Sequence, residues 1–253
     1  MSEGDDPPAD AGAAVTATVR EGVCRVAAPT AWRWLVTGIR GGIRRAPAAY
    51  NVTVPEGFDR TDLDAYTRER RREAGFDTDG PALLTGVAMR HARVAVRGPV
   101  TVLATGGLSN PATLPLGGAV PPTASGGDDR PPVGTVNLVV ATDRALAAGT
   151  CAELLATAVE AKTATLLDAT GFTGTSSDAV AVGCDPSGAP AEFAGSATGV
   201  GAATRACVRD ALLASLDARY DGRGNELPDT VAAAEHGVVT DGSARVFAPD
   251  GAE

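Results

Sequence analysis

A run of β-branched and small apolar residues in the middle of the chain most constrains its fold. Residues 135–141 form a continuous segment of this kind, which is typical of a strand buried in a sheet. Helical patterns follow at 151–168, opened by a capping box at Thr150–Glu153, and at 202–220, with a strand pattern at 179–184 between them. These elements predict an α/β fold with a mixed central β-sheet flanked by helices.

Shorter patterns add elements on both sides of this segment. Residues 15–28 alternate around a Glu-Gly turn and predict a hairpin, and residues 59–74 predict a helix that Thr61 caps and Gly75 ends. Further strands are predicted at 31–37, 50–54, 92–96 and 100–104. A second hairpin is predicted around Asp241-Gly242, between 238–239 and 246–247, so the single domain ends in a hairpin on each side.

Two segments lack any such pattern. Residues 1–14 are small or acidic and predict a disordered acidic tail. Residues 117–134 are rich in Pro and Gly and predict an exposed insertion. The remaining chain, 15–253, is predicted to form one domain around this insertion.

The charge balance excludes several classes of partner. Acidic residues number 31 against 22 basic ones, which gives a net charge of −9 and argues against binding to nucleic acid or to an anionic membrane surface. No run approaches the ~20 apolar residues of a membrane span, and the N-terminus is acidic where a signal peptide would be basic. We expect a cytoplasmic protein of a salt-adapted, halophilic type, with no nucleic-acid or membrane partner and an oligomeric state that the sequence leaves open.

Cysteine and histidine usage gives no sign of a metal centre. The 4 cysteines are far apart without a C-x-x-C pair, and there are 2 histidines. This pattern predicts buried free thiols rather than a zinc site or a disulfide framework. The sequence also lacks the glycine-rich motifs that bind nucleotides, so we expect no metal and no cofactor.

Lys162 stands out because it is the only lysine among the 22 basic residues. A lysine retained where arginine is otherwise used indicates a need for a compact ammonium that can lose its proton. At helical spacing Lys162 shares an apolar stripe with Leu155, Val159 and Leu166, and burial there would lower its pKa and make it a base. The alternative is a stem that carries its amine to solvent or to a carboxylate.

The loop at 173–178 is the second candidate feature. Its glycine and hydroxyl residues can expose backbone N–H groups and present a nucleophile, with Asp178 at the strand entrance to orient it. A hydroxyl beside a lysine is an arrangement found in hydrolases. The same residue types also make ordinary turns.

Three asparagines lie at or inside predicted strands, where an amide needs partners. Asn51, Asn110 and Asn137 could converge on one pocket and hold the amides of a ligand. Separately, they are turn caps or satisfied core groups.

Several motifs, taken in order, resemble the adenosylcobinamide amidohydrolases of corrinoid salvage. In the first half these are Gly41-Gly42, Asn51-Val52-Thr53-Val54-Pro55, Leu83-Leu84-Thr85 and Ala104-Thr105-Gly106-Gly107-Leu108-Ser109-Asn110. In the second half they are Gly134-Thr135-Val136-Asn137, Thr157-Ala158-Val159-Glu160-Ala161-Lys162-Thr163, Thr173-Gly174-Thr175-Ser176-Ser177-Asp178 and Ala194-Gly195-Ser196-Ala197-Thr198. Ser177 stands where a threonine is expected, and the Pro/Gly insertion is longer than the family needs.

The resemblance implies a single catalytic domain that hydrolyses the amide joining aminopropanol to the corrin ring of adenosylcobinamide, giving adenosylcobyric acid for reuse in cobalamin biosynthesis. The cobalt belongs to the substrate. The class-level alternative is a non-catalytic corrinoid-binding protein, which would release no aminopropanol.

The residues that match the motifs then receive roles. The hypothesis assigns the nucleophile to Ser176 or Thr175, proton transfer to Lys162, oxyanion donors to the backbone of 174–176, and orientation to Asp178 and Glu160. Glu160 activating a water directly is a rival, and side chains two apart on a helix, such as Glu160 and Lys162, do not face each other. The residues expected to bind substrate are Asn51, Asn110, Asn137, Gly174 and Thr198.

Overall fold

The computed structural model of the chain describes residues 14–115, 134–221, 226–234 and 236–249. Its 8-stranded main sheet has the order β4-β3-β2-β11-β8-β6-β5, with β1 paired to β2. These strands are β1 (Thr16–Arg20), β2 (Val23–Val36), β3 (Gly42–Thr53), β4 (Ala82–Thr85), β5 (Arg93–Arg97), β6 (Val100–Gly106), β8 (Val136–Thr142) and β11 (Ala179–Cys184). The pairs β11/β8 and β3/β4 are parallel and the others antiparallel. The predicted α/β class with a mixed central sheet is confirmed.

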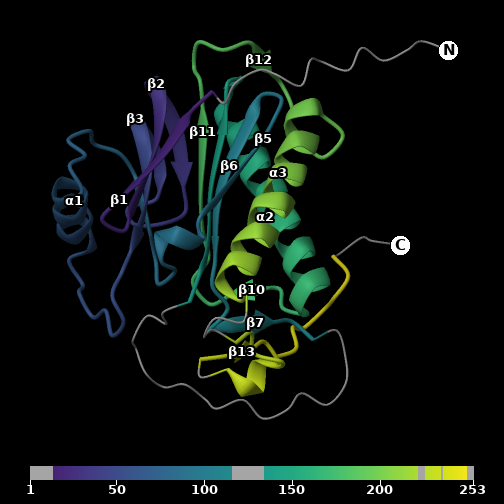
Figure 1. Cartoon of the computed structure of the whole chain (residues 1–253). Coiled ribbons are helices and arrows are strands. Elements are labelled where there is room, and N and C mark those ends of the chain that lie inside the picture. The colour runs from purple at the N-terminus through teal and green to yellow at the C-terminus, as the bar shows by residue number, and fades with distance from the viewer. Residues whose placement is uncertain (1–13, 116–133, 222–225, 235, 250–253) are drawn as a thin grey trace.

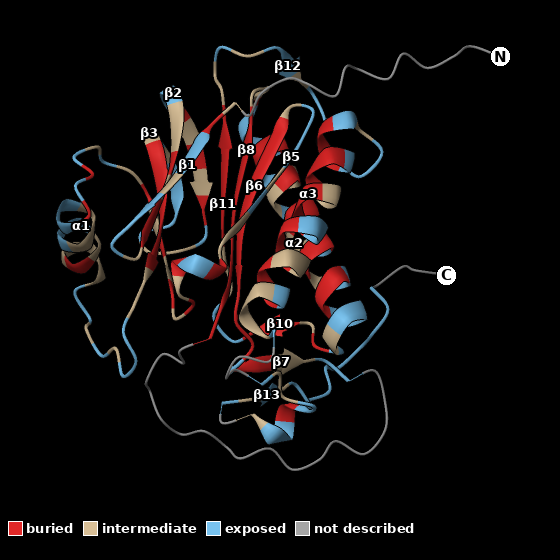
Figure 2. Cartoon of the chain, viewed as in Figure 1, coloured by how far each residue is buried: buried red, intermediate tan, exposed pale blue. Residues whose placement is uncertain are grey.

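Two long helices, α2 (Ala148–Thr170) and α3 (Gly199–Arg219), cover one face of β6, β8 and β11 (Figure 1). The parallel strands β8 and β11 are joined by α2 in a crossover connection. Alternate residues of β8, such as Leu138 and Val140, point into the core under the helices. Burying each such side chain contributes about 1.5–3 kcal/mol, and these central strands are buried along their length (Figure 2).

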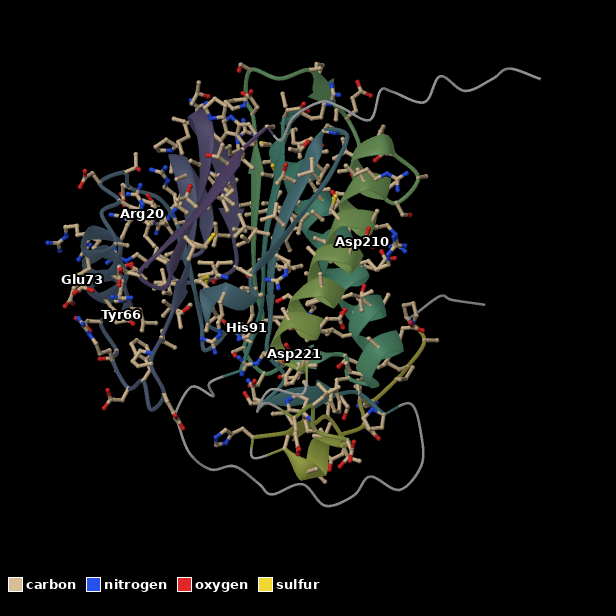
Figure 3. All side chains as sticks on the ribbon, in the orientation of Figure 1. Arg20, Tyr66, Glu73, His91, Asp210 and Asp221 are labelled. Carbon is tan, nitrogen blue, oxygen red and sulfur yellow. The ribbon has the colours of Figure 1, made fainter. Side chains whose placement is uncertain are left out.

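The opposite face of the same strands is covered by the first part of the sheet, which curls over it. Trp34 of β2, Leu83 of β4, Leu103 of β6 and Val139 of β8 belong to one buried cluster between the two parts. Helix α1 (Leu63–Glu73) packs outside β2 and β3, and Figure 3 shows its Tyr66 on that side of the molecule. The sheet therefore has an interior on each face, one against helices and one against strands.

The N-terminal hairpin predicted at 15–28 is confirmed as the β1/β2 pair. The strands predicted at 31–37 and 50–54 are the second parts of longer strands, β2 and β3. Their pairing shifts in register between Ala27 and Trp32, around Pro29, which has no N–H to donate to a ladder. This proline interrupts the sequence pattern without ending the strand.

The helix ends are confirmed, but the predicted helix starts are wrong. Gly75 and Gly171 follow α1 and α2 with φ of 69° and 76°, the left-handed region that glycine adopts at helix ends. The capping box of α2 does not form, because the helix already begins at Ala148 and its N-cap makes no side-chain hydrogen bond. Instead, the Thr150 hydroxyl donates to Glu192 O (3.0 Å) and Glu153 Oε2 accepts from Ala194 N (2.7 Å). The two side chains tie α2 to the segment before α3.

Helix α1 likewise begins at Leu63, after Asp62, and no side chain caps it, so Thr61 is not its cap.

The C-terminal hairpin predicted around Asp241-Gly242 is wrong. A small sheet has the order β10-β7-β13, formed by β7 (Pro111–Thr113), β10 (Gly174–Thr175) and β13 (Val238–Val239). Strand β13 takes β7 as its parallel partner, and Thr240 N donates to Thr113 O at 3.1 Å. Among the described residues no strand follows β13, and Val246 and Phe247 are 91% and 75% exposed.

The shorter elements are the pair β9 (Ala145–Leu146) and β12 (Pro190–Ala191) and the single turns η1 (Met89–His91) and η2 (Val231–Ala233). Most of the predicted tail, 1–14, and insertion, 117–134, lies outside the described residues. Of these two segments, Ala14 packs against the cluster that contains Trp34, and Gly134 is buried. In the ranges that the structure describes, no helix is long and apolar enough to cross a lipid bilayer.

Candidate active site

Polar side chains gather at the end of the sheet where β8 and β11 begin, next to β10 and β7 (Figure 1). Thr135 directly precedes β8 and Asp178 directly precedes β11. The two strands pair in parallel with Ala179 opposite Asn137, so both approaches to the sheet lie side by side. Lys162 reaches the same place from α2, which packs on β10 and β11.

Lys162 lies on the side of α2 that faces the sheet and is 6% exposed. Ala158 and Leu166, one turn before and one turn after it, are also buried. Its ammonium forms a salt bridge with Asp178 Oδ2. An unpaired charge at this depth costs several kcal/mol, so each partner holds the other in place. The amine thus pairs with a carboxylate, and that carboxylate is a predicted site residue.

Asp178 is the acceptor on which the loop converges. Besides Lys162, its Oδ1 accepts from the Thr175 hydroxyl at 2.5 Å and from Val136 N at 3.0 Å, and its Oδ2 accepts from Thr175 N at 3.2 Å. The side chain is largely covered, with 13% exposed. Charge-assisted hydrogen bonds of this kind fix the carboxylate between a lysine and a hydroxyl. Lys162, Asp178 and Thr175 thus form one connected cluster.

Ser176 and Ser177 are the exposed hydroxyl residues of the loop, and Ser176 is the one tied most closely to Asn110. Its Oγ accepts from Asn110 Nδ2 at 2.7 Å, and its N–H donates to Asn110 O at 3.2 Å. The Ser176 hydroxyl proton is left free to donate outward, since its oxygen already accepts. Asn110 Oδ1 is buried and has no hydrogen-bond partner among the described residues. Asn110 therefore positions Ser176 rather than facing solvent itself.

At two positions in this site only glycine fits, because neighbouring atoms lie too close to leave room for a side chain. A Cβ on Gly174 would lie 2.7 Å from Asp178 Oδ2 and 3.0 Å from Lys162 Nζ. A Cβ on Gly134 would lie 2.2 Å from Asn110 Oδ1. A Cβ carbon essentially never lies within 3.0 Å of a non-bonded atom, so any other residue would displace Asp178 or Asn110.

Asn51 and Asn137 meet on the other face of the sheet. Asn137 Nδ2 donates to Asn51 Oδ1 and to Leu84 O, both at 2.8 Å, and Asn51 Nδ2 donates to Thr105 Oγ1 at 2.9 Å. Both asparagines are 0% exposed. We call Asn51, Asn137 and Thr105 the amide network. Its side chains are satisfied by protein groups, so the geometry favours the core alternative over direct contact with a ligand.

A single hydroxyl links the amide network to the loop. Thr135 Oγ1 lies 2.7 Å from Ser177 O and 3.2 Å from Asn137 Oδ1. Ser177 Oγ in turn donates to Gly134 O at 3.1 Å. The loop is therefore hydrogen-bonded to both Gly134 and Thr135, the two residues that lead into β8.

Comparison with known proteins adds a family to this geometry. The family model described as adenosylcobinamide amidohydrolase matches residues 8–224 of the chain. The chain belongs to the adenosylcobinamide amidohydrolase family. The matched range contains the whole Lys162–Asp178–Thr175 cluster and both faces of the sheet.

Two curated proteins match the chain. The adenosylcobinamide amidohydrolase of Halobacterium salinarum is 53% identical over 237 residues, which cover 92% of this chain and 98% of that protein. The adenosylcobinamide amidohydrolase of Methanosarcina mazei is 29% identical over 193 residues, covering 72% of this chain and 89% of its own length. No solved structure matches the chain.

Two of the residues assigned from the family resemblance lie away from the cluster. Glu160 points outward from α2 and pairs with Arg205 of α3 at 2.5 Å, with 64% of its side chain exposed. Thr198 is the N-cap of α3, where its Oγ1 accepts from Gly201 N at 3.0 Å. Its hydroxyl also donates to Gly195 O at 2.9 Å, so the printed hydrogen bonds of its side chain stay within the turn that starts α3. Glu160 is two helical positions from Lys162 and so lies on another side of α2, and the Thr198 side chain is used as a helix cap.

The backbone donors expected for an oxyanion also differ. Thr175 N donates to Asp178 and Ser176 N donates to Asn110 O, so both are engaged within the loop. Sequence reasoning also missed Thr135, Val136 N and Gly134, although the Gly-Thr-Val-Asn motif that enters β8 contains them. A hydroxyl immediately before a buried strand was the available signal.

The described residues contain no group of three or more His, Cys, Asp or Glu side chains that could hold a metal ion. His91 is buried in η1 with its Nδ1 2.8 Å from Ala218 O. Burial lowers the pKa of His91, although the hydrogen bond to Ala218 opposes the shift. Its partner is a backbone carbonyl rather than a nucleophile.

Proposed function

We propose that this chain hydrolyses the amide bond between aminopropanol and the corrin ring of adenosylcobinamide, releasing adenosylcobyric acid. Family membership supports the reaction class, and the observation that carries the assignment of residues is the connected cluster of Lys162, Asp178 and Thr175. An amide hydrolase needs a nucleophile, a proton acceptor, and a proton donor for the leaving amine. The cluster offers one group for each task.

Thr175 is the nucleophile in this proposal. Its hydroxyl already donates to Asp178 Oδ1 at 2.5 Å, a direct hydrogen bond through which the carboxylate can take its proton. As Thr175 Oγ bonds to the amide carbon, its proton passes to Asp178. The other candidate, Ser176, has an amide donor beside its oxygen instead of a base. Its free proton suits it to donate to the oxyanion, in place of the engaged backbone N–H groups.

Lys162 supplies the proton that the leaving nitrogen needs. As the C–N bond breaks, the ammonium donates to the aminopropanol nitrogen, and Asp178 returns the Thr175 proton to the lysine. The ester formed on Thr175 is then hydrolysed by water through the same groups in reverse order. Glu160 has no part in these reaction steps, because its side chain faces solvent and pairs with Arg205.

The test is turnover of adenosylcobinamide, followed by the release of free aminopropanol. Thr175→Ala and Lys162→Arg are each expected to lower kcat by about 10³-fold or more, because a guanidinium cannot serve as the donor that Lys162 provides. Ser176→Ala is expected to cost about 10–100-fold, the effect of one oxyanion donor. If Ser176→Ala abolishes turnover and Thr175→Ala does not, the two hydroxyls exchange roles.

Trapping an acyl-enzyme on residue 175 by mass spectrometry would separate nucleophilic attack from attack by water. A protein that binds adenosylcobinamide tightly but releases no aminopropanol would instead be a corrinoid-binding protein.

We also propose that the catalytic unit is the single domain 15–253 and that it acts in a cytoplasm of high salt. The excess of 31 acidic over 22 basic residues, the four free thiols and the 53% identity to a Halobacterium salinarum protein support this setting. The partner is the corrinoid itself, and the net charge of −9 argues against a nucleic acid.

A further inference from the structure

Two of the four cysteines face each other where α2 packs on the sheet. Cys151 lies in the first turn of α2 and Cys184 is the last residue of β11. Their sulfur atoms are 3.6 Å apart, and both side chains are 0% exposed within the core that also contains Leu146 and Leu154. The two thiols are free and in contact.

The surroundings favour a thiolate at one of these sulfurs. Arg33 lies directly opposite Cys184 in the β2/β11 pair, and its Nη1 donates to Leu146 O at 2.7 Å. The hydrogen bond from Cys151 lowers the pKa of Cys184, although burial opposes this shift. The Leu146 backbone and the Arg33 charge lower it further, while Asp185 raises it. The same hydrogen bond, together with burial, raises the pKa of Cys151.

The other two cysteines provide a contrast within the same chain. Cys24 belongs to the cluster between the two parts of the sheet, and Cys207 Sγ lies 3.8 Å from the Val100 carbonyl. Burial raises the pKa of Cys24 to about 12 and that of Cys207 to about 11. These single thiols stay protonated near neutral pH and are poor nucleophiles.

We propose that Cys151 and Cys184 are a redox modification site, which closes to a disulfide when the protein meets hydrogen peroxide and opens again with a thiol reductant. The Cys184 thiolate attacks one peroxide oxygen, the O–O bond breaks, and hydroxide leaves to take the Cys151 proton as water. Cys151 sulfur then displaces the hydroxyl of the sulfenic acid, which leaves as hydroxide and takes up a proton from solvent. In total, two thiols and one peroxide give one disulfide and two waters, since Cys184 had lost its own proton to solvent.

The position of the pair sets its consequence. The sulfurs must approach from 3.6 Å to a bond of about 2.05 Å. The bond would join residues 33 apart in sequence and restrict the unfolded chain. It would tie α2 to β11 at the ends opposite to Lys162 and Asp178. We therefore expect oxidation to slow unfolding while leaving the cluster intact, and the proposal does not depend on which reaction the cluster catalyses.

The experiment treats the reduced, purified chain with a small excess of hydrogen peroxide and then alkylates it under denaturing conditions. The expected result is loss of two of the four alkylatable thiols, a peptide cross-linked through residues 151 and 184, and a thermal midpoint raised by about 5–10 °C. Dithiothreitol should restore all four thiols and the original midpoint.

Matched variants identify the pair. Cys24→Ser and Cys207→Ser should still lose two thiols, whereas Cys151→Ser and Cys184→Ser should lose no pair. Peptide mapping of the wild-type chain gives the answer even if a variant fails to fold. Four thiols that survive peroxide, oxidise at equal rates, or cross-link in another combination would overturn the proposal.

Discussion

Two polar clusters lie at the same end of β8 and β11, one on each face of the sheet. On the helix side, Lys162, Asp178 and Thr175 combine a buried ion pair with a hydroxyl beside a loop that reaches solvent. On the strand side, the amide network is neutral, 0% exposed at both asparagines, and satisfied by protein groups. The sequence suggested both as candidate sites. The difference is that one cluster holds charge and borders an exposed hydroxyl, whereas the asparagines of the other are fully buried.

This contrast indicates that polar side chains at the end of a sheet can serve either catalysis or the stability of the fold. The amide network joins β3, β6 and β8, and so fixes the curled part of the sheet against the central strands. Thr135 connects this network to the loop at 173–178 through its hydrogen bond with Ser177 O. Substitutions should therefore affect activity on one side and stability on the other.

The largest effect is expected at Asp178. Asp178→Asn should lower kcat by about 10³-fold, because the proton acceptor is lost, and should lower the free energy of unfolding by about 3 kcal/mol, because Lys162 is left buried and unpaired. Adding Lys162→Met should restore much of the stability but none of the turnover. Steady-state kinetics and urea unfolding measure the two quantities, and a double variant that regains activity would contradict the assignment.

The next largest effect should distinguish the two faces of the sheet, by comparing unfolding free energy with kcat. Asn137→Ala removes the hydrogen bonds to Asn51 and to Leu84 O, and should cost about 3 kcal/mol of unfolding free energy with kcat changed by no more than about threefold. The same substitution at Asn110 should cost about 1 kcal/mol but lower kcat by about tenfold, because Ser176 loses its positioning partner. A large kcat loss in Asn137→Ala with full stability would place Asn137 in contact with substrate.

A smaller effect is expected from crowding the cluster. Gly174→Ala puts a methyl group 2.7 Å from Asp178 Oδ2 and 3.0 Å from Lys162 Nζ, and the resulting shift should lower kcat by about tenfold. Gly149→Ala is the control, since a Cβ there meets nothing within 4 Å and alanine favours the helix by about 0.5–1 kcal/mol. Equal kinetics in the two variants would mean that the loop tolerates displacement.

The smallest effect should come from Glu160. Its ion pair with Arg205 is exposed, so Glu160→Gln should change unfolding free energy by less than about 0.5 kcal/mol and leave kcat unchanged within about twofold. Activation of a water by Glu160 would instead require a kcat loss comparable to that of Asp178→Asn. Parallel assays of both variants decide between these outcomes.

The parts of the fold that depend on short-range pattern could be predicted from the sequence. The buried strand at 135–141, the helix ends at Gly75 and Gly171, and the first hairpin each depend on neighbouring residues. The start of α2 and the pairing of the last strand could not, because Thr150 bonds to Glu192 and β13 pairs with β7, partners far away in the chain. Long-range partners outweigh local capping and turn preferences.

The candidate site follows the same division. The solitary Lys162 and the loop at 173–178 were visible as unusual residue choices, and the structure brings them together at Asp178. The meeting of Asn51 with Asn137 depends on how the sheet curls, which no local pattern encodes. Glu160 shares a family motif with Lys162 but lies on the other side of its helix.

The end of the sheet that carries the cluster is the amino end of the parallel strands, whereas ligands of open α/β sheets usually bind at the carboxyl end. Because α2 and α3 both finish here, their terminal carbonyl groups give this rim partial negative charge. Arg219 in the last turn of α3 offsets part of this charge, and the amino ends of both helices, where phosphate groups commonly bind, lie elsewhere. The rim suits a reaction whose departing fragment becomes an ammonium ion.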